Sequence, residues 1–282
     1  MAKYKLAMIK RIFINLQTAF NKKEYVVKYS KGKFTKSNIG DALNIYLFEK
    51  IFDKNVVNYK EVMNIGIPPV YSFIGSVLDN SAVRNLTVMG SGFKSSSSPM
   101  PKLPKRVLSC RGPLTREKLI NLGMKNVPEV YGDPAILLPN HFDLKVTKKY
   151  KMGLIPHYTD QDSDLVKYYN NNEHVKIIDV FSPMEKFVED IKSCEFTMSS
   201  SLHGIILSHA YKVPSGWMKL SENLIGGSFK FDDYYQSLGS SAKPVIFDID
   251  STIHSLANQA EFLNVGQLAE KLQLSFKNFK IH

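Results

Sequence analysis

The sequence lacks a long hydrophobic run and is poor in cysteine. None of its 282 residues lies in an apolar stretch approaching the roughly 20 residues needed to cross a bilayer, so we expect a soluble or peripheral protein. Its two cysteines, Cys110 and Cys194, lie far apart without metal-ligand spacing, which excludes a disulfide scaffold and suits a reducing cytosol. With 44% hydrophobic and 22% charged residues, the composition is globular, and we expect neither disorder nor a fibrous repeat.

Acidic residues are scarce in the first 36 positions, which hold ten lysines and arginines against Glu24 alone. This segment therefore carries +9 of the net charge of +11, and the rest of the chain is nearly neutral. A basic segment on a neutral body fits contact with an anionic surface better than a nucleic-acid groove spread over the protein. We expect no nucleic-acid partner.

Apolar side chains in residues 4–20 recur at three- and four-residue steps, which predicts an amphipathic leader helix. The stripe consists of Leu6, Ile9, Phe13, Leu16 and Phe20. Lys10 and Arg11 interrupt the hydrophobic stretch, so we expect no signal peptide. Two roles stay open for this helix: packing on the body of the protein, or contact with a membrane surface.

Beyond the leader, short β-rich runs alternate with helical stretches, which is typical of an α/β protein with mainly parallel sheets. We predict two Rossmann-like domains with a ligand cleft between them, at the C-terminal ends of the strands. The predicted parts are a basic leader helix over 1–24, an N-terminal domain over 25–143, a C-terminal domain over 149–254 and a helical segment over 255–282.

Two helix predictions in the second half depend on local signals. Ser182 as N-cap, Pro183 at the first helical position and Glu185 at the third predict a capping box. Residues 255–276 carry spaced leucines and are predicted to form one final helical stretch.

Polar and glycine-rich clusters follow several predicted strands, where free N–H groups and the helix dipole favour anions. In the first cluster, Gly40 would allow close backbone approach, and Asn38 and Asp41 could bind sugar hydroxyls; helix capping is the alternative. The second, Gly90-Ser91-Gly92-Phe93, has serine where a dinucleotide fingerprint needs its third glycine, and a tight turn is the alternative.

The third cluster is Arg111-Gly112-Pro113, with an arginine just before a helix that begins at proline. Such an arginine could hold a carboxylate or phosphate through two hydrogen bonds, although an exposed surface arginine is the alternative. The neighbouring sequence Tyr131-Gly-Asp133-Pro134 fits a structural turn better.

The fourth cluster, Ser199–Gly204, is the strongest. Three serines end a strand, and His203 follows in the first turn of an apolar helix. Packing explains such a histidine poorly, because the positive helix end disfavours its charged form, whereas proton transfer would explain it. His157 is a second candidate, and His209 is expected to be packed. A hydrolase triad is not expected, since no Gly-x-Ser-x-Gly occurs.

Five motifs stand in one order: Asn38-Ile-Gly-Asp41, Gly90-Ser-Gly92, Arg111-Gly-Pro113, Gly132-Asp-Pro134 and Ser200-Ser-Leu-His-Gly204. Over roughly residues 25–240 this ordered set resembles the polysaccharide pyruvyl transferase family. The resemblance implies a GT-B-like arrangement with an acceptor-side N-terminal and a donor-side C-terminal domain. It also implies phosphoenolpyruvate as donor, no metal or cofactor, and a pyruvate ketal formed on a nucleotide- or lipid-linked saccharide of an exopolysaccharide or capsule.

The implied chemistry makes His203 the acid for the donor and Asp41 the base for the acceptor. Many members of the family carry arginine where this chain has Ser201, so the donor needs other cations. Donor contacts are expected from Arg111, His157, Ser200, Ser201, Gly204 and Lys230. Acceptor contacts are expected from Asn38, Gly40, Ser91, Gly92 and Phe93.

We expect such an enzyme in the cytoplasm, with peripheral contact to the inner membrane face through its leader. Two other classes of function stay open. A GT-B glycosyltransferase would use a nucleotide sugar and release no phosphate from phosphoenolpyruvate. A non-catalytic module would bind a membrane or nucleic acid through the basic leader and would not need His203.

Overall fold

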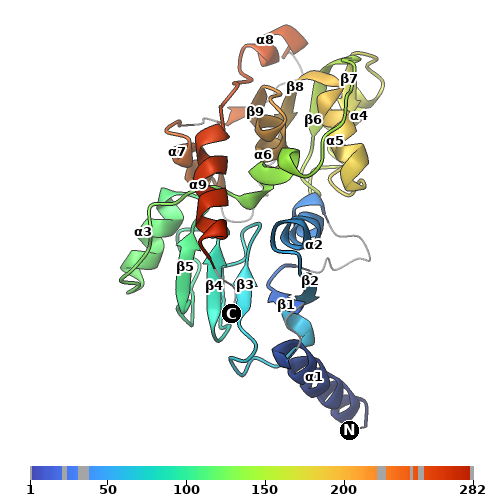
Figure 1. Cartoon of the computed structure of the whole chain (residues 1–282). Helices are drawn as coiled ribbons and strands as arrows, with labels where there is room; N and C mark the ends of the chain where they lie inside the picture. The colour runs from blue at the N-terminus through green and yellow to red at the C-terminus, as the bar shows by residue number, and fades with distance from the viewer. Residues whose placement is uncertain are drawn as a thin grey trace.

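The computed structural model describes residues 2–20, 24–30, 38–220, 227–241, 244–246 and 251–279, with side chains from residue 6 onward. Two five-stranded sheets form its two halves, in the strand orders β2-β1-β3-β4-β5 and β10-β9-β8-β6-β7. All the strand pairs within them are parallel. The predicted α/β class with parallel sheets is therefore confirmed, and Figure 1 shows the two halves stacked one above the other.

The first half contains the strands of one sheet and the helices that follow them in the chain. Its elements are α1 (Ala2–Phe20), β1 (Glu24–Val27), α2 (Ile39–Phe52), β2 (Asn55–Asn58), η1 (Tyr59–Glu61), β3 (Val70–Ser72), β4 (Leu86–Met89), β5 (Arg106–Ser109), α3 (Pro113–Asn121) and η2 (Pro134–Asn140).

The second half repeats this alternation. Its elements are β6 (Tyr150–Ile155), α4 (Asp164–Asn170), β7 (Val175–Ile177), α5 (Met184–Lys192), β8 (Cys194–Ser199), α6 (Leu202–Ala210), β9 (Ser215–Lys219), α7 (Phe229–Ser237), β10 (Val245–Ile246), α8 (Ile253–Ala257) and α9 (Gly266–Lys277). The sequence patterns did not predict β2, β9, β10 or α7, because each of these elements is short and has weak periodicity.

The chain returns to the first half at its C-terminal end. Helix α9 runs down beside β5 (Figure 1), and Phe276 packs with its ring centroid 5.7 Å from those of Phe52 and Phe73. This aromatic contact buries Phe276 to 4% exposure. Burial of such a ring contributes on the order of 2 kcal/mol, so α9 ties the two halves together.

Two local predictions in the second half are wrong. Pro183 is itself the N-cap of α5, and Ser182 lies outside the helix, so no capping box forms there. Residues 255–276 form α8 and α9 with a break between them rather than one stretch. The break gives the chain the change of direction that lets α9 reach the first half.

Candidate functional site

A cavity of about 770 Å³ opens between the two halves of the molecule. Its walls come from loops that follow β1 and β3, from the start of α2, and from loops that follow β6 and β8. These loops lie at the C-terminal ends of parallel strands, where α/β folds bind ligands. The cavity therefore lies where the strand order predicts a site.

His203 lies in the first turn of α6 and faces this cavity. Its ring lies so close to α2 that a Cβ atom added to Gly40 would be 2.3 Å from the ring nitrogen Nδ1. A Cβ atom on Gly75 would lie 3.8 Å from Cε1 of the same ring. Glycine at position 40 is therefore required by the approach of His203, a residue from the other half of the chain.

Asp133 lies beside the His203 ring. Its Oδ2 atom lies 3.7 Å from Nε2 of His203, which is too long for a hydrogen bond and is an ion pair only when the ring carries a proton on both nitrogens. The buried carboxylate accepts hydrogen bonds from the main chain of Gly75 and Ala135, at 3.3 and 3.0 Å. The turn at Asp133, which was predicted to be structural, therefore also places a carboxylate beside His203. The sequence signal for this second role was the position of Asp133 among the five ordered motifs.

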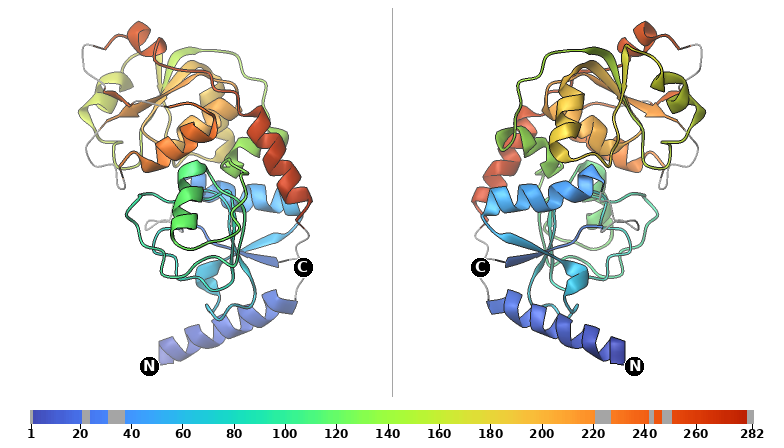
Figure 2. Two further views of the ribbon diagram at one scale, coloured as in Figure 1. Left: turned by 90° about the vertical axis from the view of Figure 1, so that its left-hand side faces the viewer. Right: turned by 90° about the vertical axis from the view of Figure 1, so that its right-hand side faces the viewer.

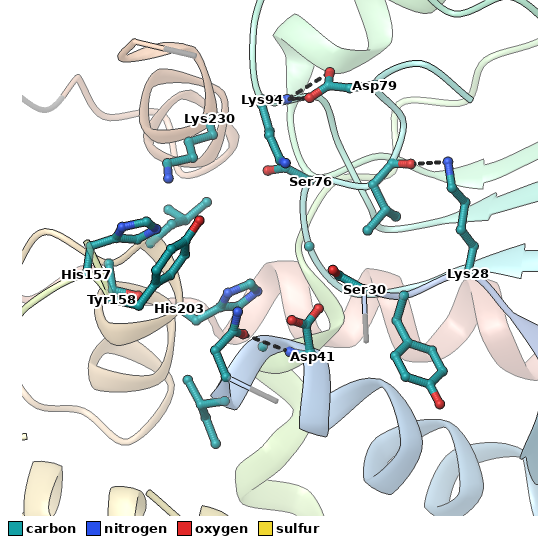
Figure 3. A pocket seen from close by; sticks show the side chains of 18 of the residues that line it. Lys28, Ser30, Asp41, Ser76, Asp79, Lys94, His157, Tyr158, His203 and Lys230 are labelled. Atoms are coloured by element: carbon teal, nitrogen blue, oxygen red, sulfur yellow. Dashed lines mark hydrogen bonds between the residues drawn. The ribbon is translucent and has the colours of Figure 1, made fainter. Parts of the chain in front are cut away.

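Asp41 comes from the first turn of α2 and points into the same cavity as His203 (Figure 3). Burial raises the pKa of its carboxyl to about 6, and the nearby His203 and the main chain of Ser30 oppose that rise. A carboxyl that titrates close to neutral pH can exchange protons with a bound hydroxyl. The structure therefore brings the two predicted catalytic residues together.

Four lysines line the cavity: Lys28, Lys60 and Lys94 from the first half and Lys230 from the second. Burial, together with the charges of Arg111 and Lys94, lowers the pKa of Lys230 to about 8. Figure 3 shows the Lys230 side chain pointing into the cavity from α7, with Lys94 entering from the other half. Lys94 was not among the predicted site residues, although it directly follows the Gly-x-Gly-Phe sequence.

His157 also lines the cavity, but as a neutral group. Burial, together with the charge of Lys230, lowers the pKa of its imidazole to about 4. Its Nδ1 atom lies 2.8 Å from the hydroxyl of Thr159, and its main-chain N–H donates to Ser200. A neutral ring at this place can offer hydrogen bonds but no positive charge at neutral pH, and the donor contact of His157 stays a prediction.

The serines before His203 have different positions. Ser201 lines the cavity at the N-cap of α6, where no side-chain cap bond forms. Ser200 is buried and donates to Asp160 at 2.9 Å, so its hydroxyl holds the loop of His157. Gly204 lies below the surface, because an added Cβ atom would be 2.4 Å from the Ser199 hydroxyl. Of these three predicted donor contacts, only Ser201 faces the cavity.

Arg111 does not line the cavity. Its guanidinium is fully buried and its Nε atom lies 3.0 Å from Oδ2 of Asp233, which is also fully buried. The two terminal nitrogens donate at 2.6 Å to the hydroxyl of Ser76 and the carbonyl of Phe93. The prediction of an arginine that faces a ligand is therefore not met by its placement, because protein groups occupy its donors.

Asp233 also accepts two hydrogen bonds from the first turn of α3. It accepts from the main-chain N–H and the hydroxyl of Thr115, at 2.8 and 2.7 Å. The N-cap of α3 is Gly112, which has no side chain to cap the helix. Asp233 from the second half therefore caps a helix of the first half, which stabilises both the helix and the contact between halves.

The second predicted acceptor cluster is structural. Ser91 is buried and its hydroxyl donates to that of Ser72, and Phe93 is buried in the apolar core. A Cβ atom on Gly92 would lie 2.6 Å from Cζ of Arg111, so this glycine makes room for the arginine. The expectation that Ser91, Gly92 and Phe93 contact an acceptor is not met, because the close approach here is to protein.

Asn38 and Gly40, in contrast, do reach the cavity. The Asn38 side chain accepts a hydrogen bond from the main chain of Asp41 at 3.1 Å, so it caps α2 as well as lining the wall. Within the described part of the chain, no group of three or more His, Cys, Asp or Glu side chains could hold a metal ion. The cofactor-free reaction remains a prediction.

Comparison with known proteins identifies the family. The polysaccharide pyruvyl transferase model matches residues 100–221, a segment that contains Asp133 and His203. The chain is 27% identical over 243 residues to the succinoglycan biosynthesis protein ExoV of Rhizobium meliloti (strain 1021), covering 84% of this chain and 72% of that protein. It is 31% identical over 229 residues to an uncharacterized protein of Acanthamoeba polyphaga mimivirus, covering 78% and 76%.

A crystal structure of a functionally uncharacterized Klebsiella pneumoniae protein is similar with a TM-score of 0.46 at 13% identity. That similarity covers 80% of this chain and 93% of the other. On the family model and these sequence relatives, the chain belongs to the polysaccharide pyruvyl transferase family.

Proposed function

We propose that the protein transfers the enolpyruvyl group of phosphoenolpyruvate to a saccharide, forms a pyruvate ketal and releases phosphate. The observation that carries this proposal is the meeting of His203 and Asp41 in one cavity that also contains Lys230. Family membership supports the reaction class, and a relative named for succinoglycan biosynthesis supports a polysaccharide product.

The donor carries a phosphate and a carboxylate, and both need positive partners. In this proposal Lys230 and Lys94 supply the charge, and the N-terminus of α6 at Ser201 supplies main-chain N–H groups. Lys230 thereby takes over from the arginine that many family members have where this chain has Ser201. Arg111 adds positive charge near Lys230 but does not touch the donor, because its side chain is bonded to protein groups such as Ser76.

The reaction follows from the positions of the acid and the base. One acceptor hydroxyl bonds to C2 of the donor while Asp41 takes its proton, and His203 gives a proton to C3, which becomes a methyl group. A second hydroxyl then bonds to C2 as the bond from C2 to the phosphate oxygen breaks, and its proton returns to His203. The proton on Asp41 leaves with the phosphate, so both residues return to their starting states. The Asp133 carboxylate lies 3.7 Å from Nε2 of His203 and would face the ring as it gives the proton to C3.

The acceptor side faces the first half, where Asn38 and the main chain at Gly40 line the cavity. We propose a nucleotide- or lipid-linked saccharide as acceptor, because the cavity of about 770 Å³ exceeds what the donor alone would fill. The GT-B-like pairing of an acceptor-side and a donor-side domain belongs to this proposal. So does a cytoplasmic location, which the two unpaired cysteines suit.

The test is incubation with phosphoenolpyruvate and a panel of linked saccharides. We expect phosphate release that depends on the acceptor, and a new methyl singlet of the ketal in the proton NMR spectrum. His254→Ala changes an exposed histidine of α8 that does not line the cavity, and it is the matched control for a histidine variant of the site. Consumption of a nucleotide sugar without phosphate release from phosphoenolpyruvate would instead assign the protein to the glycosyltransferases.

A further inference from the structure

The apolar stripe of α1 is exposed, although a helix of this kind normally buries such a stripe. Leu6, Ile9, Phe13, Leu16 and Phe20 are 72%, 62%, 67%, 54% and 83% exposed. Figure 2 shows α1 at one end of the molecule, with its N-terminal end projecting beyond the first half. The helix does pack on the body of the protein, but this stripe takes no part in that contact.

The opposite side of α1 makes the contacts with the body. Asn15 and Thr18 are buried, and the Asn15 amide donates to the carbonyl of Ile67 at 2.7 Å. Arg11 donates to the carbonyl of Lys60 at 2.7 Å. The polar side of this helix thus holds it on the protein, which turns its apolar side outward in a defined orientation.

We propose that this outward face of α1 docks the protein on an anionic phospholipid surface. The helix has no acidic residue and carries Lys3, Lys5 and Lys10 in addition to the body-bound Arg11, and Lys22 and Lys23 follow it in the sequence. Amphipathic helices with apolar residues on one side and lysines beside them lie in the headgroup region of membranes. Each such cation adds attraction to an anionic leaflet.

Charge also distinguishes this partner from a second copy of the chain. Two α1 helices packed through their stripes would bring together two sets of cations without a single acidic residue on either helix. Like charges at that distance repel, whereas lipid phosphates and acidic headgroups neutralise them. No helix among the described residues is long and apolar enough to span a membrane.

One contact connects α1 with the first-half wall of the cavity. Arg11 of α1 bonds to the main chain of Lys60, and Lys60 lines the cavity. Docking through α1 would therefore hold the first half, which is the acceptor side in the proposed function, against the membrane. The docking itself is independent of that function.

The test uses the full chain and vesicles of phosphatidylcholine with or without phosphatidylglycerol. We expect co-sedimentation with the anionic vesicles at low salt, weaker binding at high salt, and little binding to neutral vesicles. The triple variant Ile9→Gln, Phe13→Gln, Leu16→Gln should lose about tenfold or more in vesicle affinity, because it removes the apolar face. The matched control is Ile246→Gln, Phe262→Gln, Leu274→Gln, which changes equally exposed apolar residues elsewhere and should bind as the unchanged protein does.

Three results would overturn the proposal: unchanged vesicle binding by the α1 triple variant, equal binding to neutral vesicles, or a stable dimer that the α1 triple variant abolishes. The last result would assign the face to a second copy. Phosphate release on a soluble acceptor should stay the same in both triple variants. Loss of vesicle binding with intact phosphate release therefore supports docking, whereas no phosphate release from the unchanged protein would count against the proposed function alone.

Discussion

The interface between the two halves has an open region and a sealed region, and motif residues occur in both. In the open region His203, Asp41 and Lys230 face a cavity. In the sealed region Arg111 and Asp233 form an ion pair with no exposed surface. Strand-end arginines, glycines and carboxylates therefore do not all mark ligand contacts, because some of them hold together the two halves that form the cavity.

The open region should decide chemistry, and the largest expected effect is that of His203→Ala. We expect turnover to fall about a hundredfold or more, since positioned general acids typically contribute 10²–10⁴-fold. Phosphate release in the steady state measures this, with thermal unfolding as the check on folding. Turnover within a few-fold of the unchanged protein would remove His203 from the mechanism.

The sealed region should decide stability, and Asp233→Ala tests it. The change leaves the Arg111 guanidinium buried without a counter-charge and uncaps α3, so we expect a loss of about 3–5 kcal/mol in the free energy of unfolding. Urea denaturation measures this loss. The exposed pair of Lys151 and Glu195 is the control, and Glu195→Ala should cost less than about 1 kcal/mol. Equal effects of the two substitutions would contradict the comparison.

Substitution of two glycines, one from each region, distinguishes a role in turnover from a role in stability. Gly40→Ala would press a methyl group against the His203 ring, and we expect turnover to fall about tenfold with a modest change in stability. Gly92→Ala would press against Arg111, and we expect a loss of about 1–3 kcal/mol in stability instead. Phosphate release and urea denaturation of both variants measure the contrast. The opposite pattern would exchange the roles assigned to the two regions.

The smallest expected effect is a bell-shaped pH profile of kcat/KM. The base must be ionised, so the rate should fall as pH drops below about 6, where Asp41 takes up a proton. The donor needs a charged Lys230, so the rate should also fall as pH rises above about 8. Asp41→Asn should abolish the acid limb along with most of the activity. Lys230→Gln should raise the KM for phosphoenolpyruvate and flatten the alkaline limb, and Lys271→Gln on α9 is the control.

Parts of the site could be predicted from local sequence. The alternation of short strands with helices was predicted, and the histidine after the serine-rich strand end lies in the cavity as expected. Asn38 illustrates a partial success, because it both caps α2 and lines the cavity. These features depend on residues within a few positions of one another, which is the range of helix and strand patterns.

The rest depended on partners that are distant in the chain. Arg111 looked like a ligand-binding arginine, and only the fold brings it to Asp233, 122 positions later. Asp133 looked like a turn residue until the fold placed it beside His203, and Lys94 gave no local sign of its position.

By itself, the sequence determined the alternation of strands and helices, the basic amphipathic leader, and the strand ends at which polar side chains collect. Periodicity and capping act over a few residues, so these features can be read locally. The tertiary structure decided which strand-end groups face the cavity and which are buried against the other half. It also decided that the apolar stripe of α1 faces outward, because Asn15 and Arg11 bond to residues about 50 positions away. Burial and charge pairing are set by such distant neighbours, and no local pattern encodes them.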